Sequence, residues 1–148
     1  MRKALHLVRR TWLSLVDRRL RPGDIDLVRS VLTDLEFSVW SEMGEIDSRH
    51  SVRVLHRFDH RLGDATRDER AAVLLHDVGK TIARLGTLRR IGATLGLDRS
   101  ERGRLYRRHE ELGVELLVAA GVQESVVACL RGEARADVRA AFSWADDE

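Results

Sequence analysis

Apolar residues recur at spacings of three and four along nearly the whole chain, and this periodicity restricts the fold more than any other feature. The chain contains a single proline and few runs of β-branched residues, so little in it favours strands. We therefore expect an all-α protein. Its 148 residues suffice for one domain, residues 1–148, folded as a compact helical bundle around a core of ordinary size.

The periodic segments and the residues that interrupt them predict individual helices. Pro22 and Gly23 end the first helix, Asp24 can cap the second, and Gly63 and Gly121 interrupt the pattern again. A looser region with three glycines spans residues 81–97. The predicted helices cover residues 5–16, 24–39, 48–62, 67–77, 110–120, 124–130 and 136–148.

Composition limits the environment of the protein. The single cysteine, Cys129, excludes an internal disulfide and fits a reducing compartment. The longest apolar runs are about five residues, far below the roughly 20 that a membrane-spanning helix needs. We expect a cytoplasmic protein. Trp12, Trp40 and Trp144 are interpreted as core residues.

Basic residues concentrate in two segments, residues 1–21 and 89–108, although the net charge is only +2. Such segments can attract phosphate-bearing partners, so a nucleic acid or a membrane surface could bind the N-terminal helix. A solvated helix face explains the same pattern, and we favour that interpretation. A homo-oligomer also stays open.

One short string carries the strongest chemical signal. An apolar run ends in adjacent His76 and Asp77, and Gly79 and Lys80 follow. A neutral imidazole beside a hard carboxylate suits a borderline divalent metal. Gly79 is a position where a helix can end. Lys80 and Lys3 are the only lysines in an arginine-rich chain, which hints that a compact ammonium matters at position 80.

This His-Asp-x-Gly-Lys string resembles the signature of the HD-domain metal-dependent phosphohydrolases. The segment 47–54 resembles the first-helix motif of that family and nominates His50, and the final Ala145-Asp146 resembles its closing motif. The resemblance implies an HD-type core over residues 47–148, preceded by N-terminal helices over 1–46. It also implies one divalent transition metal (Mn, Fe, Co, Ni or Zn) with four ligands, namely His50, His76, Asp77 and Asp146.

The resemblance also implies a reaction. A metal-activated water would attack the phosphate of a nucleotide or another small phosphorylated metabolite. Asp77, Lys80 and His109 would be the catalytic residues, and Lys80, Arg53 and His109 would bind the substrate. Arg53 is included because it lies three residues after His50 and shares a helix face with it. His109 lies in a segment, 106–117, that resembles a further family motif.

The chain also departs from the family pattern. Members with two metals carry another histidine after the helix that follows His109, whereas residues 130–135 contain none. Glu133 is the nearest substitute oxygen ligand, but the departure favours a single metal. The same departure supports an alternative hypothesis, in which the chain is a non-catalytic HD-fold module that binds metal or nucleotide as a sensor or scaffold. His56 and His60, four residues apart, are interpreted as solvated surface residues.

Overall fold

The computed structural model describes residues 20–83 and 108–147. The predicted first helix, most of both basic segments and most of region 81–97 lie outside these ranges. No strand occurs among the described residues, which confirms the all-α prediction. The helices are α2 (Pro22–Val31), α3 (Asp34–Ser41), α4 (Glu45–Arg61), α5 (Arg67–Leu75), α6 (Lys80–Ala83), α9 (His109–Ala120), α10 (Glu124–Leu130) and α11 (Ala136–Asp147).

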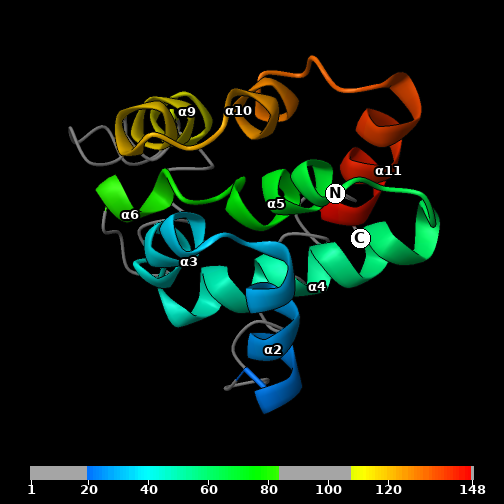
Figure 1. The fold of residues 1–148 in the computed structure, drawn as a ribbon, viewed down its shortest axis with the longest axis horizontal. Coiled ribbons are helices and arrows are strands. Elements are labelled where there is room, and N and C mark those ends of the chain that lie inside the picture. The colour runs from blue at the N-terminus through cyan, green and yellow to red at the C-terminus, as the bar shows by residue number, and fades with distance from the viewer. Residues whose placement is uncertain (1–19, 84–107, 148) are drawn as a thin grey trace, which may run out of the picture.

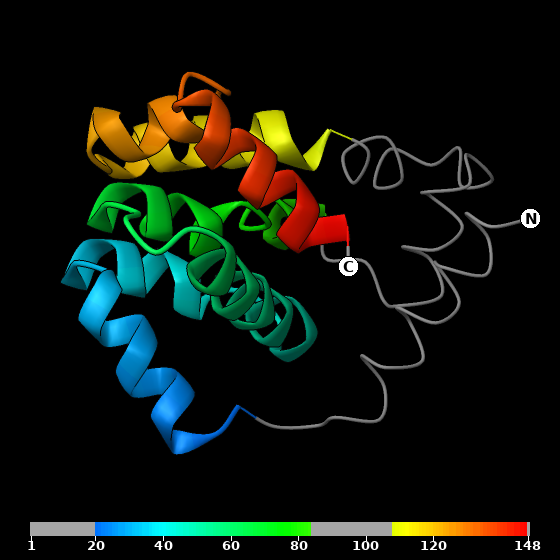
Figure 2. The ribbon, with the colours of Figure 1, turned by 90° about the vertical axis from the view of Figure 1, so that its right-hand side faces the viewer.

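Helix α5 lies at the centre of the described bundle. In both ribbon views it runs between the layer that holds α4 and the layer that holds α9 and α10 (Figures 1 and 2), and it contacts α2, α3, α4 and α10. Its residues 71–75 are all buried. A helix that is apolar on every side can be stable in water only when other helices surround it, and the apolar run before His76 therefore forms the middle of the core.

The predicted helix over 24–39 is wrong in one respect, because it is two helices. Thr33 interrupts it and caps α3: its hydroxyl accepts from the backbone N–H of Glu36, whose carboxylate accepts from the Thr33 N–H. This reciprocal capping box favours a helix start over continuation. The apolar stripe is shifted as a result, and Leu35 is 43% exposed. Asp24 is the third residue of α2, not its cap.

The other predicted helices within the described residues are confirmed to within three residues at each end. Thr66 and Glu69 start α5 with a second capping box. Gly121 separates α9 from α10 and has a φ of +82°, a left-handed conformation that favours glycine at the end of a helix. Helix α10 spans Glu124–Leu130 and α11 spans Ala136–Asp147, as the periodicity predicts.

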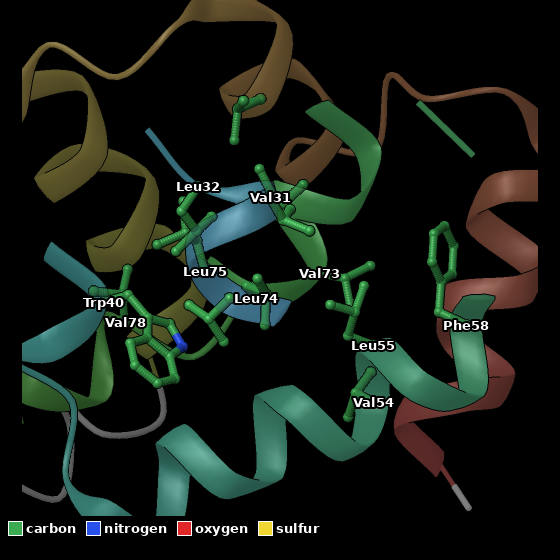
Figure 3. Close-up of a cluster of buried hydrophobic side chains, with 14 of the residues drawn as sticks. Val31, Leu32, Trp40, Val54, Leu55, Phe58, Val73, Leu74, Leu75 and Val78 are labelled. Carbon is green, nitrogen blue, oxygen red and sulfur yellow. The ribbon is translucent and has the colours of Figure 1, made fainter. Parts of the chain in front are cut away.

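The core joins α2, α3, α4 and α5 with buried residues of α9, α10 and α11, and Figure 3 shows Leu55, Phe58, Leu74 and Val78 among its side chains. Trp40 is also buried, as predicted, and its indole N–H donates to Ser51 Oγ over 3.0 Å, which ties α3 to α4. Trp144 is not a core residue, because it is 37% exposed beneath the Arg61 guanidinium. Within the described ranges, no helix is long and apolar enough to cross a bilayer.

Candidate metal centre

Three potential metal ligands from different segments converge at one end of α5. One atom each of His50, His76 and Asp77 lies within 4.8 Å of the other two. His50 comes from the middle of α4, His76 caps the C-terminus of α5, and Asp77 lies in the turn that follows. All three are largely shielded from water, and Asp77 is only 2% exposed. This buried group could hold a metal ion.

Asp146 borders the group from the last turn of α11. Its Oδ1 lies 2.8 Å from Nε2 of His50 and 3.5 Å from Nε2 of His76. Oδ2 of Asp77 lies 3.5 Å from the same nitrogen of His76 and 3.9 Å from Nε2 of His50. The four predicted ligands therefore face one another, although 96 residues separate His50 from Asp146.

The hydrogen bonding of His76 determines what it offers to the cluster. Its Nδ1 lies 2.7 Å from the carbonyl oxygen of Val73, which can only accept, so Nδ1 carries the hydrogen. In the neutral ring, Nε2 then presents a lone pair. Nε2 is buried and has no hydrogen-bond partner among the described residues. A lone pair that faces two carboxylates is electrostatically unfavourable, and either a proton on Nε2 or a divalent metal between these groups would relieve it.

The electrostatics of the cluster favour positive charge. Burial lowers the pKa of His76, but the charges of Asp77 and Asp146 outweigh it, and the net pKa is raised. Burial alone would raise the pKa of Asp77. The imidazole of His76, the hydrogen bond from His109 and the ammonium of Lys80 outweigh that effect, so the pKa of Asp77 lies well below its usual range. Asp77 is therefore anionic at neutral pH.

Two further predicted residues contact Asp77. The Lys80 ammonium, from the first residue of α6, donates to Oδ2, the oxygen that also faces the two imidazoles. On the other side, Nε2 of His109 lies 3.5 Å from Oδ1. His109 is the first residue of α9, and its side chain is 20% exposed. The structure thus brings Lys80 and His109 to the carboxylate at the centre of the cluster.

A close contact between two glycines holds His109 in this position. A Cβ on Gly79 would lie 1.8 Å from the carbonyl oxygen of His109 and 2.6 Å from the nitrogen of Gly113. A Cβ on Gly113 would lie 3.2 Å from the nitrogen of Gly79. Gly79 therefore serves close backbone approach between the turn after Asp77 and α9, and its φ is not positive. The sequence predicted a helix end at Gly79 but not this contact.

Arg53 lines a cavity of about 180 Å³ together with Arg21, Asp24 and His56, and it is not among the described residues that line the cavity beside His76 and Asp146. Residues three apart on a helix differ in direction by about 60°, whereas residues seven apart differ by about 20°. Arg57, seven residues after His50, donates to the Ala145 carbonyl of α11 over 3.3 Å.

The sequence analysis also missed a cavity of about 320 Å³ beside the cluster. We name it the side cavity. One face of α11 lines it with Arg139, Phe142, Ser143 and Asp146, at the spacing i, i+3, i+4, i+7, and His76 borders it from α5. That spacing is visible in the sequence, but the cavity depends on which helices face α11. Glu133, His56 and His60 are exposed and belong to no ligand cluster in the described ranges.

Comparisons with protein-family models, with curated proteins and with solved structures find no match for this chain. What is established is therefore the all-α bundle and a buried His50, His76 and Asp77 group that could hold a metal ion. The HD resemblance, the reaction it implies and the roles of individual residues stay predictions.

Proposed function

We propose that the protein is a metal-dependent phosphohydrolase of the HD type, acting on a nucleotide or another small phosphorylated metabolite. One observation carries the proposal. The buried Nε2 of His76, whose ring hydrogen is committed to Val73, points between the carboxylates of Asp77 and Asp146. Such an arrangement is unfavourable without a cation, and His76 and Asp77 begin the string that resembles the His-Asp-x-Gly-Lys signature of the family.

The donor set indicates the kind of metal. Two imidazoles and two carboxylates suit a catalytic divalent ion such as Mn, Fe, Co, Ni or Zn, whereas a structural zinc site favours cysteine, and the only cysteine is Cys129. His50, His76, Asp77 and Asp146 would hold one ion. When bound, the ion supplies Lewis-acid polarisation of a phosphoryl oxygen and an activated water.

The residues around Asp77 divide the remaining tasks. Its Oδ2 faces both imidazoles, while His109 contacts Oδ1 and so orients the carboxylate toward the ligand cluster. The exposed part of His109 leaves it able to pass a proton to a leaving oxygen. Lys80 neutralises Oδ2 and is a mobile ammonium within reach of an incoming phosphate.

Elemental analysis of the purified protein, followed by a phosphatase screen with the metal found, tests the proposal. We expect about one equivalent of a divalent transition metal per chain and turnover of at least one phosphate ester. His76→Ala should lose the metal and the turnover. His56→Ala is the matched control, because its ring is 58% exposed on α4 and lies outside the cluster.

The outcomes separate the alternatives. One equivalent of metal without turnover of any phosphorylated compound would support the non-catalytic sensor or interaction module. A protein that binds no metal even after reconstitution would contradict the proposed function. Turnover that survives in His76→Ala would show that the cluster is not the site of the reaction.

A further inference from the structure

The side cavity adjoins the ligand cluster directly. His76 and Asp146 belong to both, so a ligand in the cavity touches the residues that would hold the metal. Residues of α5, α9, α10 and α11 line the cavity, and Figure 1 shows where these four helices lie in the bundle. The ester substituent of a phosphoryl group bound at the cluster would have this space beside it.

The lining of the side cavity is mainly apolar. Leu75, Val114, Leu130 and Phe142 contribute apolar side chains, and Phe142 packs edge-on against the His76 ring with centroids 5.3 Å apart. Aromatic rings prefer such apolar surroundings, and a second ring beside Phe142 gains an additional aromatic contact. The lining therefore favours an apolar or aromatic group over a charged one.

Charged side chains in the lining are few. Apart from Asp146, the described lining carries one acid, Glu110, and one cation, Arg139. Arg139 is exposed and donates to the Gly132 carbonyl over 3.2 Å, which holds its guanidinium near the α10–α11 loop. Because the acids in the lining outnumber its one arginine, the cavity does not favour an anion, and we expect the anionic part of a ligand to bind at the cluster.

The size of the side cavity sets a further limit. Ligand pockets span about 300–1,000 Å³, and about 320 Å³ lies at the small end of that range. We propose that the side cavity binds the body of the substrate, and that this body is one aromatic ring system, or an apolar group of similar size, esterified to phosphate. The inference rests on the proposed function, because the phosphoryl group at the metal centre is the second anchor of the ligand.

Cys129 provides a direct test, since it lines the side cavity and is the only cysteine in the chain. Its alkylation by iodoacetamide therefore reports this cavity alone. Burial raises the pKa of the thiol, and Glu69 and Asp68 add to the effect, so the reaction is followed at alkaline pH. The probe is phenylphosphonate, which cannot be hydrolysed, and methylphosphonate is its matched control without the ring.

With the metal-loaded protein, we expect phenylphosphonate to slow alkylation of Cys129 about tenfold at a concentration about ten times its Kd. Methylphosphonate should give little protection, because it reaches the cluster without filling the cavity. The methylenephosphonate analogue of adenosine monophosphate forms a third arm. Stronger protection by it would identify the ring as a nucleobase, and weaker protection would favour a smaller aryl group. Equal alkylation rates with and without every ring-bearing probe would overturn the inference.

A pair of variants on α9 gives an independent test. Val114→Phe adds a ring inside the cavity, and Val118→Phe adds the same ring one turn later, at a position that is 49% exposed. We expect Val114→Phe to weaken phenylphosphonate binding about tenfold or more while metal content and helicity stay at the wild-type level. Val118→Phe should bind as wild type does. Unchanged affinity in a folded Val114→Phe variant would contradict the inference.

These measurements distinguish this inference from the proposed function. If phenylphosphonate protects Cys129 but the protein hydrolyses no ester, the cavity binds the ring and the proposed phosphohydrolase activity is wrong. If aryl and alkyl phosphates are hydrolysed with equal KM and Cys129 is not protected, the protein is a phosphohydrolase but the side cavity is not its substrate site.

Discussion

Two buried carboxylates in this molecule, those of Glu36 and Asp77, differ in the groups that surround them. Glu36 is 1% exposed, and one oxygen accepts from the Thr33 N–H over 2.8 Å and from the Arg67 guanidinium over 2.5 Å. Asp77 is 2% exposed, but its neighbours include imidazole nitrogens that are themselves potential ligands. The first carboxylate is satisfied by donors of the chain itself. The second also accepts from Lys80, but Nε2 of His76, which has no hydrogen-bond partner among the described residues, lies beside it, and this neighbour distinguishes a candidate ligand from a structural acid.

The difference has a physical basis. A buried charge is tolerated when hydrogen-bond donors surround it, and the backbone N–H and guanidinium around Glu36 are donors only. Around Asp77, Lys80 donates, but Nε2 of His76 faces both Asp77 and Asp146 without a hydrogen bond to either. Burial alone therefore does not identify a functional acid. The chemical nature of its neighbours does.

The largest expected effect comes from Asp77→Asn, which removes the anionic ligand but keeps the shape of the side chain. We expect metal affinity to fall by more than the 10- to 100-fold that residues behind the ligands typically contribute. Helical circular dichroism should stay unchanged, because the core of α5 is untouched. Isothermal titration with the metal found in the wild type measures the change. If the variant binds the metal with wild-type affinity, Asp77 is not a ligand and does not differ in role from Glu36.

The corresponding change at the structural carboxylate is Glu36→Ala, which removes the acceptor of the Thr33 N–H and the Arg67 guanidinium. We expect the free energy of unfolding to fall by about 3 kcal/mol, the low end of the range for broken buried pairs, because Arg67 still reaches water. Urea denaturation measures this loss. Metal content at saturating metal should not change. If Glu36→Ala abolished metal binding while the protein stayed folded, the two carboxylates would not be independent.

A smaller effect is expected from Gly79→Ala, which adds a methyl group where the His109 carbonyl lies 1.8 Å away. Helix α9 must shift, at a cost of about 2 kcal/mol in unfolding free energy. Gly63→Ala is the control, since Gly63 is exposed and no atom lies within 4 Å of its added Cβ. Equal thermal stability of the two variants would show that the glycine contact does not hold α9 in place.

The smallest effect should come from His109→Gln, which alters the contact to Oδ1 of Asp77. We expect metal affinity to fall about tenfold, equivalent to about 1.4 kcal/mol, because the carboxylate loses an orienting partner. The corresponding exposed control is His60→Gln on α4. Complete loss of metal in His109→Gln would instead make His109 a ligand, and no change would remove it from the centre.

Much of the fold could be predicted because helices depend on local pattern. The apolar periodicity located α4, α5, α9, α10 and α11 to within three residues at each end. The prediction failed at Thr33, where a capping box competed with a continuous apolar stripe and its hydrogen bonds started a new helix. That signal, Thr followed three residues later by Glu, was present in the sequence.

The candidate site shows where sequence reasoning ends. The adjacency of His76 and Asp77 is visible in the chain, and the family resemblance nominated His50 and Asp146. The direction of a side chain around a helix is less certain, and Arg53, placed by spacing alone, lines another cavity. Arg57 occupies the position next to Asp146 because seven residues complete nearly two helical turns.

The sequence by itself determined the all-α class, most helix boundaries and the residue types available for a metal centre, because periodicity and capping act within a few residues. Only the tertiary structure decided that His50 meets Asp146, and that Gly79 meets Gly113. It also decided that the face of α11 from Arg139 to Asp146 borders a cavity. These contacts join segments far apart in the chain, and helix packing around α5, not any local signal, brings them together.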